Sequence, residues 1–327
     1  MEGIPIEELR SLDIFKETNE EVLKELSKIV IKQEFADNSE IFSEGSLGDT
    51  FYIVASGEVI IRKRLGSEQN AYKDLSFLGQ GEFFGELSLI DTLKRSAQAV
   101  AHGKTLVYCI KQDDFKKLLL ACPEMAVEQL FNFLRTMSQR LRLTNNHLIA
   151  IYEVGLLISR EKEVDVLAKK ILSRIVSLMD PSIKGVMALW NPFNEEFDVK
   201  AKVGGFDNEE SLIKVITDKK FLDAFGKSGE SVVVNEIINN SSLSEHQKNV
   251  LGECDSLLFS PMFDESRNIS GFIVLFNSEK MRNFNSNHKI IVSTFSSLAS
   301  LALINAGYVQ EENSRNRLNI AKGMKHW

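Results

Sequence analysis

The residues best suited to chemistry lie close together between Gly81 and Ala97. Gly85 lets the backbone turn where a side chain would block a ligand. The run that follows, Glu86 to Ile90, can open a short helix whose first N–H groups point outward and suit an anion. Arg95 then supplies a flat fork of donors that matches two oxygens of a phosphate. The spacing predicts a site for one small phosphate ester.

Glu86 must serve another part of the same ligand, because a carboxylate and a phosphate repel each other. A carboxylate beside a phosphate site is well suited to accept a hydrogen bond from a ribose hydroxyl. The ligand predicted by the two charged residues together therefore carries both a sugar and a phosphate.

The flanking sequence completes a larger pattern. Together with the segment from Gly81 to Ala97, residues 8–145 resemble the cyclic-nucleotide-binding domain, the family of the bacterial catabolite activator protein and the regulatory subunits of cAMP-dependent kinase. Upstream, the stretches 41–45, 48–49 and 51–59 are similar to that family's strand and turn pattern, which implies a small β-roll with glycines at its turns. Downstream, Leu106 to Ile110 reads as the last strand, and Asp113, Asp114 and Phe115 read as the start of the closing helix.

This resemblance implies a role for each residue of the segment. Backbone N–H groups of the glycine turn would hold the phosphate together with the arginine and the residue after it, and the glutamate would hold the ribose 2′-OH. The implied ligand is cAMP, with cGMP as the alternative, and no catalytic or metal-binding residue and no cofactor is implied. The residues concerned are Gly85, Glu86, Leu87, Ser88, Arg95, Ser96 and Ala97. The opposing interpretation is a β-roll that kept its fold and lost its ligand.

A heptad pattern of mostly apolar residues follows, held for more than four repeats. It could be a helix that packs on its own domain, but it is longer than one β-roll can cover, so we expect a parallel homodimer built around it. Its positions are Val127, Leu130, Leu134, Met137, Leu141, Thr144, Leu148, Ile151, Gly155 and Ile158.

Two polar residues on this predicted helix also resemble a family feature. In the catabolite activator, a threonine and the adjacent polar residue of the long helix contact the purine, one from each subunit. Thr144 and Asn145 resemble this pair of residues. The segment lies about one helical turn further from the β-roll than in the family, so Leu141 or Arg140 is the alternative base contact. A polar residue on a helix seam can equally set the register of the pair.

After the helix the pattern changes to alternating helices and strands. A helix is expected at 164–179, strands at 185–190, 197–203, 231–234, 257–263 and 271–276, and a closing helix from Asn287 to about Ala306. The stretches 257–262, 271–277 and 284–286 resemble those of a GAF domain, a sensory module with an antiparallel sheet. Its ligand cannot be read from the sequence, and a dimerising, signal-relaying module without a small ligand is the alternative.

Composition limits the remaining functions. The 327 residues are 43% apolar and 26% charged, with a net charge of −7, which suits two ordinary domains and argues against binding to DNA. The sequence shows neither a bilayer-spanning apolar run nor a signal peptide, so a cytoplasmic protein without a membrane partner is expected. The three cysteines and five histidines have no ligand spacing, so no metal site is expected.

The sequence thus predicts an α+β chain: a jelly-roll-like β-roll with flanking helices at 1–125, a long coiled-coil connecting helix at 126–160, a GAF-like α/β domain with an antiparallel sheet at 161–306 and a helical tail at 307–327. The expected function is a cytoplasmic cAMP receptor that relays ligand binding to an unidentified output domain or partner. Two alternatives stay open. One is the regulatory part of a serine phosphatase, nucleotide cyclase or histidine kinase with its catalytic domain beyond residue 327, and the other is a dimerisation scaffold with a vestigial pocket.

Overall fold

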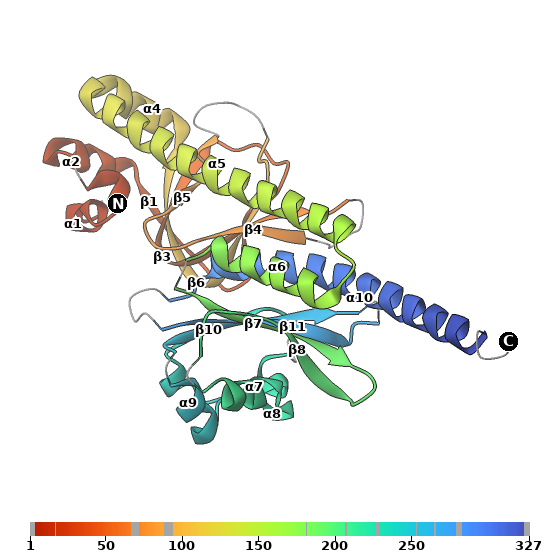
Figure 1. Ribbon diagram of the computed structural model, residues 1–327. Coiled ribbons are helices and arrows are strands. Elements are labelled where there is room, and N and C mark those ends of the chain that lie inside the picture. The colour runs from red at the N-terminus through yellow and green to blue at the C-terminus, as the bar shows by residue number, and fades with distance from the viewer. Residues whose placement is uncertain are drawn as a thin grey trace. The chain divides into compact units, whose positions relative to one another are not determined.

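The computed structural model describes residues 4–16, 18–66, 72–87, 94–180, 182–206, 208–226, 229–252, 254–264, 266–278 and 283–323. Its contacts divide the chain into two compact units, Met1–Arg142 and Leu143–Trp327. One helix, α5 (Pro123–Arg160), contributes residues to both units (Figure 1). Both units combine antiparallel sheets with helices, so the predicted α+β class is confirmed.

The first unit is a β-roll with helices on either side of it in sequence. Its strands pair antiparallel in the order β1-β6-β3-β4, with β2 added to β6 and β5 added to β3. The elements are α1 (Ile6–Arg10), η1 (Asp13–Phe15), α2 (Glu20–Ile29), β1 (Ile31–Phe35), β2 (Glu40–Phe42), β3 (Thr50–Arg64), β4 (Tyr72–Leu78), β5 (Phe83–Phe84), β6 (Gln98–Lys111), α4 (Gln112–Ala121) and the first part of α5. The strand predicted at 106–110 is the second half of β6.

An aromatic cluster joins β5 to α5 within this unit. The ring of Phe133 meets Phe83 edge-on at 5.0 Å and Phe51 at 5.5 Å between ring centroids. Edge-to-face pairs of this kind add about 0.5–1.5 kcal/mol to the burial of the rings themselves. The strand that leads into the predicted site is thereby packed directly against the helix that leaves the unit.

Helix α5 carries a series of exposed apolar side chains. Val127, Leu130, Leu134, Leu141 and Leu148, five positions of the predicted heptad, are each more than half exposed. Other positions of the same heptad pack on a unit's own core: Met137 on that of the first unit, and Ile151 and Ile158 on that of the second. The heptad therefore serves two purposes along its length: from Val127 to Leu148 its positions are exposed apart from Met137, and Ile151 and Ile158 pack on the second unit.

The second unit is built on a five-stranded antiparallel sheet of order β8-β7-β11-β10-β9. Its elements after α5 are α6 (Val164–Ser177), β7 (Lys184–Asn191), β8 (Glu196–Val203), α7 (Glu209–Thr217), α8 (Lys219–Phe225), β9 (Val232–Asn235), η2 (Ile237–Asn239), α9 (Glu245–Leu251), β10 (Ser256–Phe263), β11 (Ile269–Asn277) and α10 (Ser286–Gly323). All the strands predicted after residue 160 are present, with ends shifted by a few residues.

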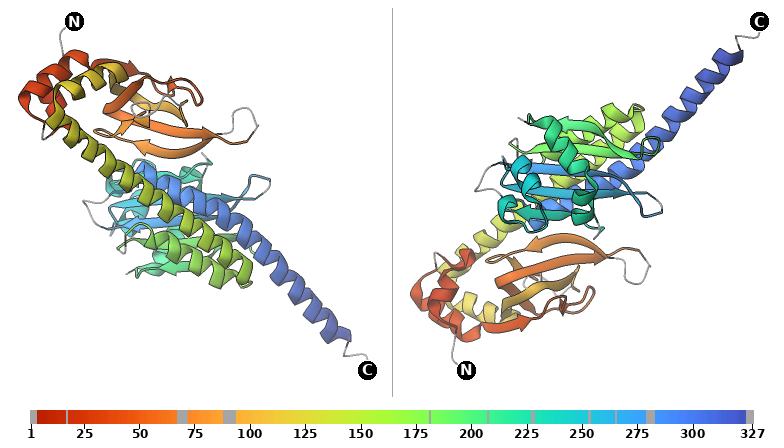
Figure 2. Two further views of the ribbon diagram at one scale, coloured as in Figure 1. Left: turned by 90° about the horizontal axis from the view of Figure 1, so that it is seen from above. Right: turned by 90° about the horizontal axis from the view of Figure 1, so that it is seen from below.

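Each face of this sheet has its own core. Along β11, Phe272 and Val274 lie in the core that also contains α7, α8 and α9, whereas Ile273 and Leu275 lie in the core formed with α6 and α10. This alternation follows from the strand's period of two, and burial on both faces explains why the strand reads as a continuous apolar run. The two helical layers face the viewer in turn in the two views of Figure 2.

Helix α10 continues without a break past Ala306 to Gly323, so the predicted closing helix and the first part of the predicted helical tail are one helix. Among the described residues one stretch, Ser286–Gly307, is long and apolar enough to cross a bilayer, and half of that apolar window is buried inside the structure. Val292, Phe295 and Ala299 lie fully or almost fully buried in the core of the unit. Packing against the sheet therefore accounts for much of the hydropathy of this stretch.

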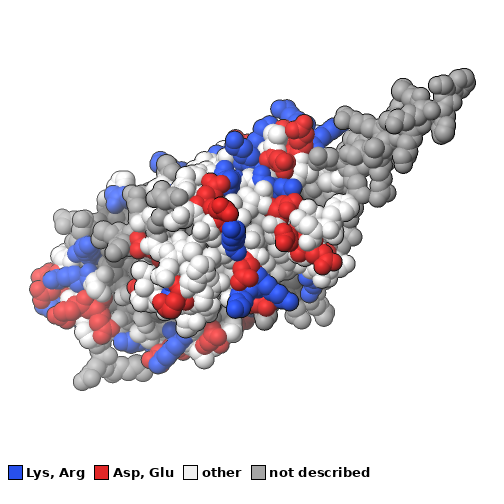
Figure 3. Space-filling view, turned by 60° about the horizontal axis from the view of Figure 1, so that its bottom comes forward, with Lys and Arg blue, Asp and Glu red and all other residues white. Residues whose placement is uncertain are grey.

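Charged side chains of the described residues are interspersed rather than grouped by sign on the face shown in Figure 3. Exposed ion pairs among the described residues include Lys24 with Glu20 at 3.0 Å and Lys214 with Glu210 at 2.8 Å. Exposed pairs of this kind contribute only about 0–1 kcal/mol each, so they matter more for solubility than for folding.

Candidate functional site

The predicted phosphate segment leaves the β-roll at β5. Tyr52 and Ile53 of β3 pair with Phe84 and Phe83, and the next residue, Gly85, has a φ of +73°. A left-handed backbone of this kind is unfavourable for most side chains and explains the glycine. Glu86 and Leu87 follow it, with Leu87 exposed. Ser88 and the rest of 88–93 lie outside the described residues.

The chain returns to the β-roll at Arg95, whose backbone is fixed on both sides. Its N–H donates to the carbonyl of Ser46 at 2.8 Å, and its carbonyl accepts from the N–H of Gly45 at 2.8 Å. The loop before β3 and the residues before β6 thus hold each other in register. This pairing carries the arginine side chain to the start of the Gly85 turn.

The Arg95 guanidinium is packed tightly in the β-roll, with the whole residue 8% exposed. Its Nη1 donates to the carbonyl of Gly85 at 3.1 Å and its Nη2 to the carbonyl of Thr50 at 2.7 Å. The charge also lies over the ring of Phe42, 4.2 Å from the centroid. A Cβ on Gly85 would stand 2.7 Å from Nη1, and one on Gly48 would overlap the guanidinium. Both neighbouring glycines therefore make room for this side chain.

The charge of Arg95 has no close counter-charge in the part of the chain that the structure describes. It forms no ion pair with a described carboxylate, and its Nε is buried without a hydrogen-bond partner there. Burial lowers the pKa of Arg95, while nearby Tyr52, Asp49 and Glu86 oppose that shift. An arginine nonetheless stays protonated in proteins. The site is therefore a buried cation that contacts no carboxylate among the described residues, which favours binding of an anion.

Glu86 is mostly buried and contacts a residue of α5. Its Oε1 lies 3.6 Å from Nη1 of Arg140, whose Nη2 also donates to the carbonyl of Phe83 at 2.6 Å. The Arg140 guanidinium further lies over the Phe83 ring at 5.0 Å. The predicted ribose carboxylate is thus connected to the helix that leaves the unit. From the sequence, Arg140 was interpreted as part of a solvated helix face or as an alternative base contact, and no local pattern points to its pairing with a glutamate 54 positions earlier.

The other predicted residues lie on both sides of the unit boundary. Ser96 is exposed, with its carbonyl accepting from Nζ of Lys63 at 3.2 Å, while Ala97 is buried. Thr144 and Asn145 are exposed on the part of α5 that belongs to the second unit. The structure thus brings Gly85, Glu86, Arg95, Ser96 and Ala97 together in one unit and assigns Thr144 and Asn145 to the other.

Sequence comparisons find a matching family and relatives for the part of the chain that contains this site. Residues 32–122 match the family described as "Cyclic nucleotide-binding domain". The "Cyclic AMP receptor protein" of Thermus thermophilus is 39% identical over 103 residues, 31% of this chain and 44% of the relative. The "CRP-like cAMP-activated global transcriptional regulator" of Mycobacterium tuberculosis is 31% identical over 135 residues, 41% of this chain and 58% of the relative. The chain thus spans only about half the length of each of these two relatives.

Solved structures resemble the same region. The Thermus thermophilus catabolite activator protein is 28% identical over 45% of this chain and 69% of its own, with a TM-score of 0.36. The regulatory domain of Toxoplasma gondii PKA, solved with cAMP, is 28% identical over 41% of this chain and 48% of its own, also with a TM-score of 0.36. At these TM-scores the assignment depends on the sequence match alone. Residues 32–122 of this chain form a cyclic nucleotide-binding domain.

Proposed function

We propose that the chain is a receptor for cAMP that passes ligand binding from the β-roll through α5 to the second unit. The observation that carries the proposal is the buried Arg95 guanidinium, which has no ion-pair partner among the described residues. Leaving a buried charge unpaired is costly, so the site gains from an anion that fits it. A relative named as a cyclic AMP receptor protein supports the choice of cAMP.

The charge of the site favours a cyclic phosphate over a linear one. A cyclic nucleotide carries a single negative charge on a phosphodiester, whereas AMP carries nearly two on its monoester at neutral pH. Arg95 can neutralise one charge, while Asp49 and Glu86 act electrostatically on the same guanidinium. A second negative charge on the ligand would be repelled by these carboxylates.

The contacts of the ligand follow the residues of the segment. Arg95 and Ser96 would bind the phosphate together with the N–H groups of the Gly85 turn, including those of Leu87 and Ser88. Ala97 would leave room for the ligand, and Glu86 would accept the hydrogen bond of the ribose 2′-OH. Thr144 and Asn145 would contact the purine. No metal or cofactor is part of this proposal, and no group of three metal-binding side chains is found in the described ranges.

The proposed relay begins where ligand and helix share a residue. Glu86 faces the proposed ribose and lies near Arg140, so a ligand that binds Glu86 changes the free energy of the contact between Glu86 and α5. The ligand can transmit a signal only if it binds more tightly when α5 is in one position than when it is in another. The exposed leucines of α5 support a parallel homodimer in which the second helix covers them. A GAF-like second unit would receive the change and pass it to an output domain or partner in the cytoplasm.

Isothermal titration calorimetry on the full chain tests the proposal with cAMP, cGMP and AMP. We expect cAMP to bind with 1:1 stoichiometry per chain, and AMP to bind at least about tenfold more weakly because of its second charge. Tighter binding of cGMP than of cAMP would mean that the chain is a cyclic-nucleotide receptor whose ligand is cGMP. If none of the three releases or takes up heat at several temperatures, the pocket is vestigial and the proposal is wrong.

A further inference from the structure

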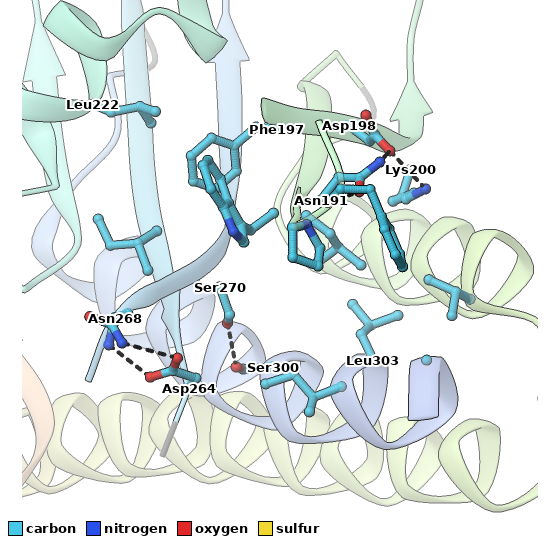
Figure 4. Close-up of a pocket in the computed structure, with 18 of the residues that line it drawn as sticks. Asn191, Phe197, Asp198, Lys200, Leu222, Asp264, Asn268, Ser270, Ser300 and Leu303 are labelled. Carbon is cyan, nitrogen blue, oxygen red and sulfur yellow. Dashed lines mark hydrogen bonds and ion pairs between the residues drawn. The ribbon is translucent and has the colours of Figure 1, made fainter. Parts of the chain in front are cut away.

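A groove in the second unit is independent of the nucleotide site. It is formed by β7, β8, the turn between β10 and β11, α8 and α10, and encloses about 1190 Å³ (Figure 4). Pockets for small molecules usually measure about 300–1,000 Å³ and enclose most of their ligand. A cavity larger than this that is also open to solvent is better suited to a peptide segment that lies in a groove.

The wall of the groove contains exposed aromatic side chains. Trp190 is 42% exposed and meets Phe197 edge-on at 5.0 Å, and Phe193 is 88% exposed. The hairpin that carries them is held in shape, because the Asn191 side-chain carbonyl accepts from the N–H of Phe193 at 3.0 Å and the Asn194 side chain accepts from the N–H of Glu196 at 3.2 Å. The aromatic residues are thus presented by an ordered turn, which lowers the entropy cost of binding.

The charged lining of the groove is mainly acidic. Asp165, Asp198, Asp223 and Asp264 line it against a single basic residue, Lys200. The Lys200 ammonium lies 3.5 Å from Asp198 and 4.0 Å from Asp165, so it is already shared between two carboxylates. An apolar floor with an acidic rim is complementary to a segment that is both basic and apolar. Ammonium groups would also gain from the faces of the aromatic rings.

The same chain contains a segment of this chemistry. Residues 313–327 include four lysines and arginines and no acidic residue, with Leu318, Ile320, Met324 and Trp327 as large apolar side chains. We propose that the groove binds residues 313–327 of a second copy of this chain. The acidic rim would pair with the basic residues, and the apolar side chains would cover Trp190 and Phe193.

The geometry of α10 requires a second copy. Leu303, Ile304 and Gly307 of this helix line the groove, and the helix continues without interruption to Gly323. At 1.5 Å per residue, residue 313 lies about 9 Å further along the axis than Gly307, and each later residue of the helix up to Gly323 lies further still. A continuous helix cannot return to the groove that its own earlier turns line. Figure 1 shows α10 running on past the sheet of its own unit.

The chain carries a natural reporter for this contact, because its two tryptophans are Trp190 in the groove and Trp327 in the segment. In Trp190→Phe the remaining emission belongs to Trp327, and the groove keeps an aromatic side chain. We expect that emission to shift to shorter wavelength as the concentration of the full chain rises, since binding in trans depends on concentration. Adding Asp165→Lys and Asp223→Lys, two exposed rim residues, should raise the midpoint concentration about tenfold.

The control is Glu210→Lys in the same Trp190→Phe background. Glu210 is an exposed acid of the same unit that pairs with Lys214 and does not line the groove, so the change in net charge per substitution is the same. Far-UV circular dichroism checks that each variant keeps its fold. The proposal is wrong if Trp327 emits as a solvated indole at every concentration, if its shift does not depend on concentration, or if the two rim substitutions affect the midpoint no more than Glu210→Lys does.

Discussion

Replacing Arg95 by alanine separates the cost of the arginine to the fold from its benefit to the ligand. In the free protein the substitution removes two hydrogen bonds, to the carbonyls of Gly85 and Thr50, and the contact with the Phe42 ring. It also removes a buried charge without an ion-pair partner in the described chain, which is itself unfavourable. These effects oppose each other, so the unfolding free energy of the free protein should change by no more than about 2 kcal/mol.

Ligand binding should respond much more strongly. Hydrogen bonds to charged groups contribute about 1.5–3 kcal/mol each, so losing the guanidinium fork should cost about 3 kcal/mol. That is about two decades in the dissociation constant. At a cAMP concentration 100 times the wild-type dissociation constant, binding stabilises the fold by about 2.7 kcal/mol. The variant would be about half saturated at that concentration and would gain only about 0.4 kcal/mol.

Urea denaturation with and without cAMP measures both quantities in one experiment. The matched control is Arg62→Ala on β3, which also loses a hydrogen bond, to Gln98 at 2.6 Å, and a contact with the Tyr72 ring at 4.5 Å. Arg62 is not among the proposed ligand contacts, so its variant should keep the full stabilisation by cAMP. The reasoning fails if Arg95→Ala retains that stabilisation, or if Arg62→Ala loses it to the same extent.

Three further predictions concern the sugar, the helix and the second unit. Glu86→Ala should weaken cAMP and leave the affinity for 2′-deoxy-cAMP almost unchanged, and equal losses in calorimetry would assign Glu86 a structural role. Leu148→Cys in a Cys122→Ser background allows disulfide cross-linking between the α5 helices of two chains. The yield of this cross-link should change on saturation with cAMP, and Arg140→Ala should reduce that change. A yield that does not depend on cAMP would mean that α5 only connects the units and carries no signal. Burial lowers the pKa of His288, whose Nδ1 accepts from the N–H of Asn285 at 3.2 Å at the start of α10. The unfolded chain then binds a proton more readily than the folded one, so the free energy of unfolding should fall as pH drops below about 6.5. Denaturation curves of His288→Gln should show a weaker dependence on pH. If the substitution leaves the pH dependence unchanged, other groups cause it.

The sequence was informative where local pattern and local structure coincide. Gly85 requires a positive φ, which the structure has, and the apolar run around Ile273 is a strand buried on both faces. Strands of this kind can be recognised because every position is apolar. The domain boundaries at 125, 160 and 306, the GAF-like identity and the nucleotide contacts stay predictions.

The sequence was less informative about which face of a helix packs on a core and about contacts between residues far apart in the chain. A heptad gives the faces of α5 but not which of them turns toward a core, so Ile151 was grouped with the exposed Leu148 although it packs in the second unit. The contact of Arg140 with Glu86 depends on tertiary packing and leaves no periodic signal. The sequence predicts a closing helix to about Ala306 and a separate helical tail at 307–327, whereas α10 continues without a break through the polar run 310–317 to Gly323.

The two glycines that make room for Arg95 have a consequence for how such a pocket can change over evolutionary time. Because a methyl group on Gly48 would overlap the guanidinium, Gly48→Ala should be harmful while Arg95 is present and tolerated once the arginine is replaced by a small residue. Gly85 is less free, since its positive φ would still disfavour a side chain after the arginine has gone. The order of substitutions is thereby constrained: a lineage that loses its ligand must change Arg95 first, and only then can Gly48 vary. Loss of the ligand would then be hard to reverse. Once Gly48 has become alanine, its methyl group would overlap the guanidinium of a restored arginine at position 95.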